Sequence, residues 1–107
     1  MFKSEVVVRF AGGMDQDRLN ALRSVLSLER TGRLTDDWDQ ILGRRRNDVP
    51  GGRLLILLFR EDTDGPWEVQ IDSEGDVDAF SFQHLENEAR SAVESVGMQV
   101  TGIWRRT

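Results

Sequence analysis

The segment from residue 72 to residue 78 has the densest run of side chains that could do chemistry. Carboxylates occupy every second position, at Asp72, Glu74, Asp76 and Asp78. A calcium-binding EF-hand loop needs glycine at its sixth position and an acidic residue at its twelfth. Counting from Asp72, the glycine is fourth and the twelfth residue is Gln83. We therefore expect no metal site, although weak calcium binding by a hairpin turn stays an open alternative, and we interpret the segment as an acidic hairpin.

A second acidic turn begins at Glu61, and the two turns together define a predicted binding surface. Residues 61–94 contain eleven acidic side chains and one arginine, a net charge of -10 in a chain whose total is -5. This block repels phosphate, which argues against nucleic acid as the partner of this face. It either attracts a basic protein or is a solvated surface. The predicted partner-binding residues are Glu61, Asp62, Asp64, Trp67, Glu68, Asp72, Glu74, Asp76 and Asp78.

The other reactive residue types match no catalytic or cofactor-binding pattern. The single histidine, His84, is expected on the outer side of the last helix, and no serine has a G-x-S-x-G context. Gly12-Gly13 joins a strand to a helix, but the acids that follow would repel a phosphate there. Cysteine is absent, so no thiolate metal site exists. We predict no catalytic residues, no cofactor and no metal, and a carboxylate enzyme is left open.

The spacing of apolar residues predicts a single α+β domain over residues 1–107. We expect strands over 2–10, 54–59, 67–72 and 98–104 with a short one over 77–80, and helices over 16–31, 35–43 and 81–96. Asp15 is the expected N-cap of the first helix and Ser81 that of the last. This order predicts a ferredoxin-like split β-α-β fold, an antiparallel sheet of four to five strands with two main helices on one face.

The alternation of side chains along these strands divides the sheet into two faces. The residues expected to face the helices are Val6, Val8, Phe10, Trp67, Val69, Ile71, Val100 and Trp104. The other face is expected to show Val7, Arg9, Glu68, Gln70, Asp72, Thr101 and Ile103, with alternate residues of strand 54–59, which we expect to be covered on both sides. An apolar strip of that size needs a cover. Either the short helix carrying Trp38, Ile41 and Leu42 crosses it, or a second chain does.

These features predict a small, acidic, non-enzymatic protein-binding module of the cytoplasm that covers a basic partner, with Trp67 or an exposed aliphatic residue as anchor. Its size and charge, though no motif, are similar to those of bacterial toxin-neutralising immunity proteins and phage-borne inhibitors. The longest apolar run has six residues, too few to cross a membrane. The start of the sequence is too short and too charged to resemble a secretory signal.

Two alternatives use the open side of the sheet or the whole surface. In one, a homodimeric ferredoxin-like protein encloses a small molecule between two sheets, as a ligand sensor or a cofactor-free enzyme. The predicted lining of that site is Val7, Arg9, Leu55, Leu57, Phe59 and Ile103. In the other, the chain is a structural or assembly subunit.

Overall fold

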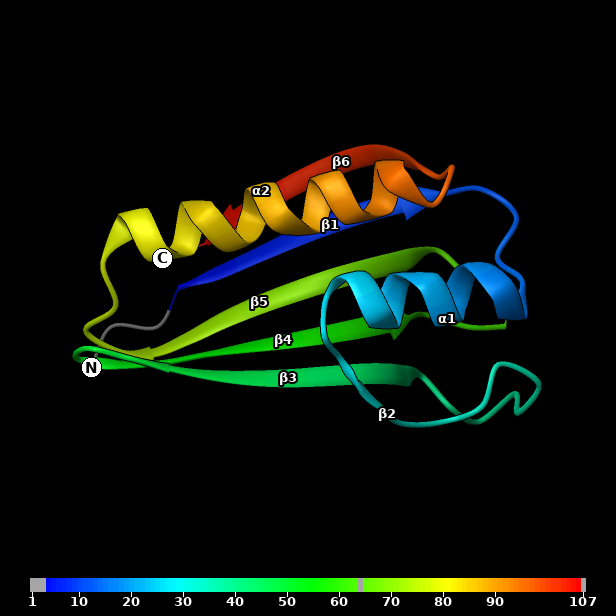
Figure 1. The fold of residues 1–107 in the computed structure, drawn as a ribbon, viewed down its shortest axis with the longest axis horizontal. Helices are drawn as coiled ribbons and strands as arrows, with labels where there is room; N and C mark the ends of the chain where they lie inside the picture. Colours follow the sequence, from blue (N-terminus) through cyan, green and yellow to red (C-terminus); the bar gives the residue numbers. More distant parts are fainter. Residues whose placement is uncertain (1–3, 64, 107) are drawn as a thin grey trace.

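Six strands and two helices form the described part of the chain, residues 4–63 and 65–106 of a computed structural model (Figure 1). The strands are β1 (Glu5–Ala11), β2 (Glu29–Arg30), β3 (Ile41–Val49), β4 (Gly52–Arg60), β5 (Trp67–Gly75) and β6 (Gln99–Arg106). The helices are α1 (Gln16–Val25) and α2 (Ala79–Ser95), and both lie on the same side of the sheet (Figure 1). The predicted positions of Phe2 and Asp64 fall outside the described residues.

The strands form one antiparallel sheet in the order β2-β3-β4-β5-β1-β6. The predicted ferredoxin-like sheet of four to five strands is therefore wrong, because six strands are present among the described residues and their order differs. The error comes from the segment between α1 and β4. It supplies two strands, β2 and β3, at one side of the sheet. β2 lies where we expected the end of the helix over 16–31, since α1 already ends at Val25, and β3 begins where we expected the short helix over 35–43.

The predicted helix over residues 35–43 is replaced by turns and by the start of β3. Its apolar residues at helical spacing do not share a face, since Leu42 is buried whereas Ile41 is 42% exposed and Trp38 is 91% exposed. The three arginines after Gly43 lie within a strand and not at a helix C-terminus. Trp38 is exposed to solvent, so the predicted internal cover of the sheet is also wrong.

A fully buried arginine at the end of β4 organises this irregular segment. Arg60 has no exposed surface, and its guanidinium donates hydrogen bonds to main-chain carbonyls instead of to a carboxylate. Nε donates to the carbonyl of Asp39 at 2.7 Å, Nη1 to that of Leu34 at 2.9 Å and Nη2 to that of Asp36 at 2.6 Å. The guanidinium also lies 5.7 Å from the ring centroid of Trp67. One side chain thus satisfies several carbonyls that a helix would have paired internally.

A second buried arginine, Arg23, fixes the same segment to α1. Its Nε donates to the carbonyl of Leu42 at 2.7 Å, and Nη2 donates to the carbonyls of Thr31 and Gly32. Burial, and next the neighbouring charge of Arg30, lower the pKa of Arg23 from its ordinary value. The segment between α1 and β3 is therefore held from both sides by arginines whose charge is dispersed over peptide carbonyls.

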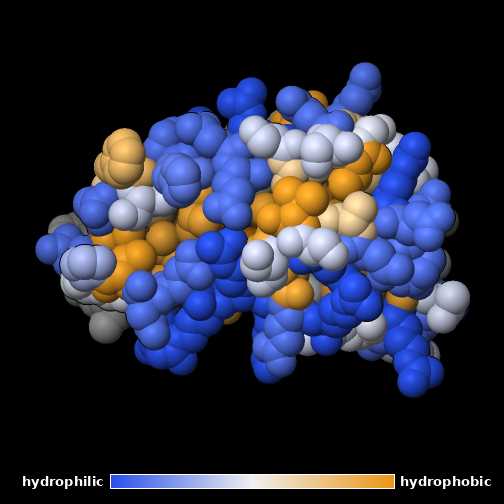
Figure 2. All heavy atoms as spheres, viewed as in Figure 1, coloured by the Kyte–Doolittle hydropathy of each residue, from blue (hydrophilic) through white to orange (hydrophobic). Residues whose placement is uncertain are grey.

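The hydrophobic core lies between the sheet and the two helices. The predicted inward residues of β1 and β5 are confirmed as buried: Val6, Val8, Phe10, Trp67, Val69 and Ile71. They pack with Leu19 and Leu22 of α1 and with Leu85, Ala89, Ala92 and Val93 of α2. Seen from the helix side, apolar residues run as a band between the helices and hydrophilic residues border it (Figure 2). Each helix therefore packs an apolar side on the sheet, although Val25, which has the helical spacing of the buried leucines of α1, is 51% exposed.

The prediction for the last strand is wrong at Trp104 and Ile103. The pairing of β1 with β6 shifts register between Arg9 and Phe10, which is a β-bulge. Val100 pairs with Phe10 and packs on the core, and beyond the shift Ile103 packs there too. Trp104 pairs with Val7 on the other face and is 48% exposed. One extra residue in the strand therefore reverses the parity that simple alternation gives.

Helix α2 begins earlier than predicted, because Asp78 and not Ser81 is its N-cap. The Asp78 carboxylate accepts a hydrogen bond from the main-chain nitrogen of Ser81 at 2.7 Å and one from its hydroxyl at 3.2 Å. Residues 77–80 accordingly contain the cap and the first helical residues in place of a strand. The predicted N-cap of α1 is confirmed: Asp15 accepts from the main-chain nitrogen of Arg18 at 2.8 Å.

Replacing Asp78 with alanine is expected to lower the melting temperature by a few degrees, since the first turn of α2 loses its acceptor. The main-chain and then the hydroxyl hydrogen bond from Ser81 lower the pKa of Asp78. A lowered folded-state pKa stabilises the protein fully above the unfolded value of about 3.9, and that stabilisation disappears as the pH falls through the folded value. The difference in melting temperature between the wild type and D78A should therefore shrink below about pH 4. A difference that is constant with pH would contradict the cap.

Candidate functional site

The structure does not gather the nine predicted partner-binding residues into one acidic ridge. Glu61 and Asp62 precede β5, whereas Asp76 and Asp78 follow it. The nine residues of β5 span about 30 Å, so these two acidic groups lie at opposite ends of the sheet (Figure 1). Of the remaining predicted residues, Glu68, Asp72 and Glu74 lie along β5 itself, and Asp64 lies outside the described residues.

Several of the predicted residues are occupied within the chain, among them Trp67, Glu68 and Glu74. Trp67 is only 4% exposed and packs under Arg60, so it cannot be an accessible anchor. Glu68 is 8% exposed, and its Oε2 accepts from Nη2 of Arg9 at 2.8 Å and from Nε at 3.0 Å. Glu74 binds Nε of Arg53 at 2.7 Å. Local pairing therefore removes much of the charge that we expected to attract a basic partner.

The sheet has a second surface, which we call the open face: its side away from both helices. In β4 the even-numbered residues Leu54, Ile56 and Leu58 are buried under the helices. Leu55, Leu57 and Phe59 alternate with them and are half-buried, so the described residues alone do not provide the predicted cover on both faces of β4. These three residues form the apolar column of the open face. No segment of residues 4–63 or 65–106 that the structure describes covers them.

Charged side chains of opposite sign flank the apolar column. On one side, β3 places Arg44 beside Leu57 and Arg46 beside Leu55, which we call the basic column. On the other side, β5 places Glu68 beside Phe59 and Asp72 beside Leu55, which we call the acidic column, with Gln70 between them beside Leu57. From the level of Leu57 to that of Leu55, the antiparallel register therefore places arginines on one side of the apolar column and the polar Gln70 and Asp72 on the other.

A network of side chains holds the far side of the acidic column in place. The Arg9 guanidinium, bound to Glu68, also lies 4.7 Å from the ring centroid of Trp104. Gln70 donates from Nε2 to Oε1 of Glu68 at 3.1 Å. Side chains fixed in this way lose little conformational freedom when a partner binds. The open face is therefore partly preorganised for an interaction.

Arg44, Arg46 and Trp104 also belong to this face, although they were not among the residues predicted for it. A signal for the arginines was present: Arg44, Arg46 and Asp48 alternate with residues that face the helices, as in a strand. Arg45 between them reaches under the helices, where Nη1 donates to the carbonyl of Leu26 at 3.1 Å and binds Glu88 at 3.0 Å. Three identical residues in a row concealed the period of two. Ile103, a predicted lining residue of the small-molecule alternative, packs on the core and not on this face.

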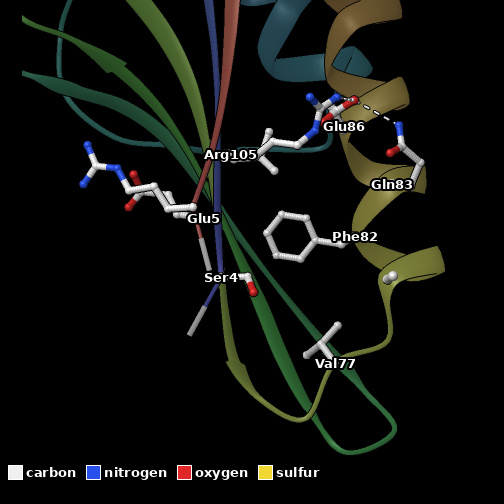
Figure 3. A pocket seen from close by; sticks show the side chains of 10 residues that line it. Ser4, Glu5, Val77, Phe82, Gln83, Glu86 and Arg105 are labelled. Atoms are coloured by element: carbon white, nitrogen blue, oxygen red, sulfur yellow. Dashed lines mark hydrogen bonds and ion pairs between the residues drawn. The ribbon is translucent and has the colours of Figure 1, made fainter. Parts of the chain in front are cut away.

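A cleft of about 290 Å³ lies elsewhere, between the start of α2 and the ends of β1 and β6 (Figure 3). Phe82 points into it from α2, toward Ser4 of the neighbouring chain segment (Figure 3). The buried carboxylate beside it, Glu86, is 1% exposed and binds Nη2 of Arg105 at 2.8 Å and Nε2 of Gln83 at 2.9 Å. This pairing joins α2 to β6. The cleft is thus explained by packing between two elements.

The described residues contain no cluster of three or more His, Asp or Glu side chains that could hold a metal ion. His84 is exposed on α2, as predicted. Neither helix in the described part of the chain is long and apolar enough to cross a membrane. Comparison with family models, with curated proteins and with solved structures gives no match. The open face is therefore the surface from which a function is inferred.

Proposed function

We propose that the protein is a binding module that recognises another protein chain through the open face of its sheet. The observation that carries the proposal is the half-buried apolar column of Leu55, Leu57 and Phe59 between columns of opposite charge. Protein interfaces combine an apolar centre with a polar rim, and the rim charges select the partner. The open face has this composition, and the described chain leaves it uncovered.

Because the open face carries both basic and acidic side chains, the partner must present both acidic and basic groups to it. Arg44 and Arg46 bind Glu29 and Asp48 through Nε only, and these exposed guanidinium groups keep other donors for acidic groups of a partner. Asp72 carries the opposite charge on the other side of the apolar column. We propose binding without catalysis, since charged residues of the face pair with each other across neighbouring strands, as Arg9 does with Glu68 and Arg53 with Glu74. A cytoplasmic location and a toxin-neutralising or inhibitory role stay predictions.

Leu57→Arg tests this proposal, because it places a charge in the centre of the apolar column. Tagged wild type and L57R are used as baits in lysate of the source cell that also contains a differently tagged copy of the chain. We expect a partner that the wild type retains and L57R loses by at least about tenfold, because burial of an unpaired charge costs several kcal/mol. Phe80→Arg is the matched control, since Phe80 is 82% exposed at the start of α2. A wild type that retains nothing, or equal retention by L57R, would contradict the proposal.

A further inference from the structure

We propose that the occupant of the open face is a second copy of this chain, related by a two-fold axis that runs parallel to β4. This inference rests on the proposed function and names its partner. Most homo-oligomers are closed by a two-fold axis, which brings the same patch of both copies together. The patch must therefore be complementary to itself, and the columns of the open face meet that condition.

An axis along β4 packs the apolar column of one copy on that of the other. The same axis places β3 of each copy over β5 of its mate, at the same level along the strand. Leu57 marks one level, where Arg44 is opposite Gln70 of the second copy. Leu55 marks the next, where Arg46 is opposite Asp72 of the second copy. Each contact occurs twice, so two arginine–aspartate pairs flank a leucine-rich centre.

Other placements of the axis lack this complementarity. An axis between β4 and β5 sets Leu55 against Asp72 and Leu57 against Gln70, which buries polar groups against leucine. An axis perpendicular to the strands and midway between the Leu55 and Leu57 levels sets Arg44 against Arg46. Like charges in contact across an interface cost several kcal/mol. The axis along β4 is the arrangement that the charges favour.

The charges also mark where the overlap ends. At the level of Arg53 the flanking residues are Asp48 and Glu74, which would face each other across the axis with the same sign. The overlap thus covers the levels of Phe59, Leu57 and Leu55 over the five strands from β2 to β1, with β1 of each copy over the short β2 of its mate. That area is about 20 Å by 24 Å for each copy, at the low end for specific interfaces. We accordingly expect a dissociation constant in the micromolar range.

Reciprocal charge reversal tests the geometry. We expect the wild type to sediment as a dimer at 100 µM, and Arg46→Asp or Asp72→Arg alone to weaken self-association at least tenfold. R46D sets two aspartates against each other, and D72R sets two arginines. An equimolar mixture of R46D and D72R should form heterodimers, since both opposite-charge pairs are then restored. R90D and E94R on the outer side of α2 are the matched controls and should dimerise like the wild type.

Circular dichroism checks that each variant is folded. A second pair of variants tests the same geometry without changing Asp72, in case D72R does not fold. Gln70→Arg sets an arginine against Arg44 and should weaken the dimer, and mixing with R44E should restore it. A monomeric wild type at 100 µM overturns the inference. So does a dimer that L57R, R46D and D72R leave unchanged, which would be an association through another surface such as the β6 edge. If the chain is monomeric but a different protein is retained by the wild-type bait and lost with L57R, the proposed function stands and this inference fails.

Discussion

Replacing Arg60 with methionine is expected to lower the free energy of unfolding by about 3 kcal/mol or more. Methionine fills much of the same space but donates no hydrogen bond. The carbonyls of Leu34, Asp36 and Asp39 then lose their donor. Each buried carbonyl left without a partner costs about 1–3 kcal/mol, less where water reaches it. Urea denaturation followed by tryptophan fluorescence measures the change.

Arg53→Met is the matched control for this prediction. Arg53 lies on the same strand as Arg60, but its side chain is 43% exposed and it binds Glu74 at the surface. A surface ion pair contributes about 0–1 kcal/mol, so R53M should have little effect. Hydrogen exchange should additionally become faster at residues 31–40 in R60M, since Arg60 holds that segment. Equal losses for the two variants would show that Arg60 does not have this organising role.

Leu58→Ala is expected to cost about 3 kcal/mol of stability, and Leu57→Ala less than about 1 kcal/mol. The two residues are neighbours with the same side chain, but Leu58 is fully buried under the helices and Leu57 is half-buried on the open face. Truncating Leu58 leaves a cavity in the core. Truncating Leu57 costs less, because part of the side chain that is removed is already in contact with solvent. Urea denaturation at submicromolar protein measures both, because self-association is then negligible.

The comparison of these two leucines also tests the open face itself. If Leu57→Ala costs as much as Leu58→Ala in the monomer, the apolar column is covered from within the same chain. The proposed binding surface would then not exist. If the cost at Leu57 rises with protein concentration while the cost at Leu58 does not, a second copy covers the column, since binding to the folded state adds stability.

The long periodic elements could be predicted from the sequence because local and global signals agree there. In α2 the stripe of Leu85, Ala89 and Val93 matches the helix period, and these residues are buried. In β1 and β5 strict alternation placed the core residues on the right face. Asp15 also combined an N-cap residue with a helical pattern directly after it. Where local propensity and the packing of the whole fold favour the same conformation, one sequence is enough to predict it.

The segment after α1 could not be predicted, because long-range contacts determine its structure. Trp38, Ile41 and Leu42 have helical spacing, and the strand and turns that form instead depend on Arg60, about twenty residues later. Pairing with β4 then decides the conformation of β3, whose own residues are mostly polar. A strand of this kind is defined by its neighbour and not by its own propensity.

Only some residues of the open face could be predicted, again because part of its structure depends on long-range contacts. Alternation correctly gave Val7, Arg9, Glu68, Gln70 and Asp72 to the open face. It failed at Trp104, because a bulge changes parity and leaves no local mark in the sequence. It also suggested an acidic ridge, because charges close in sequence were assumed to be close in space. The 30 Å length of β5 separates them, since a strand is the most extended structure a chain adopts.

The position of β1 in the sheet has a consequence for how the chain assembles on a ribosome. β1 is made before the other described strands and helices, yet both of its neighbours in the sheet, β5 and β6, are made only after β4. The hairpins linking β3, β4 and β5 can form while synthesis continues, but an apolar strand made earlier must remain without its sheet partners until later residues emerge. Pairing between distant segments is slow and exposes such strands to aggregation. Nascent chains of this protein should therefore depend on chaperones chiefly through the residues of β1.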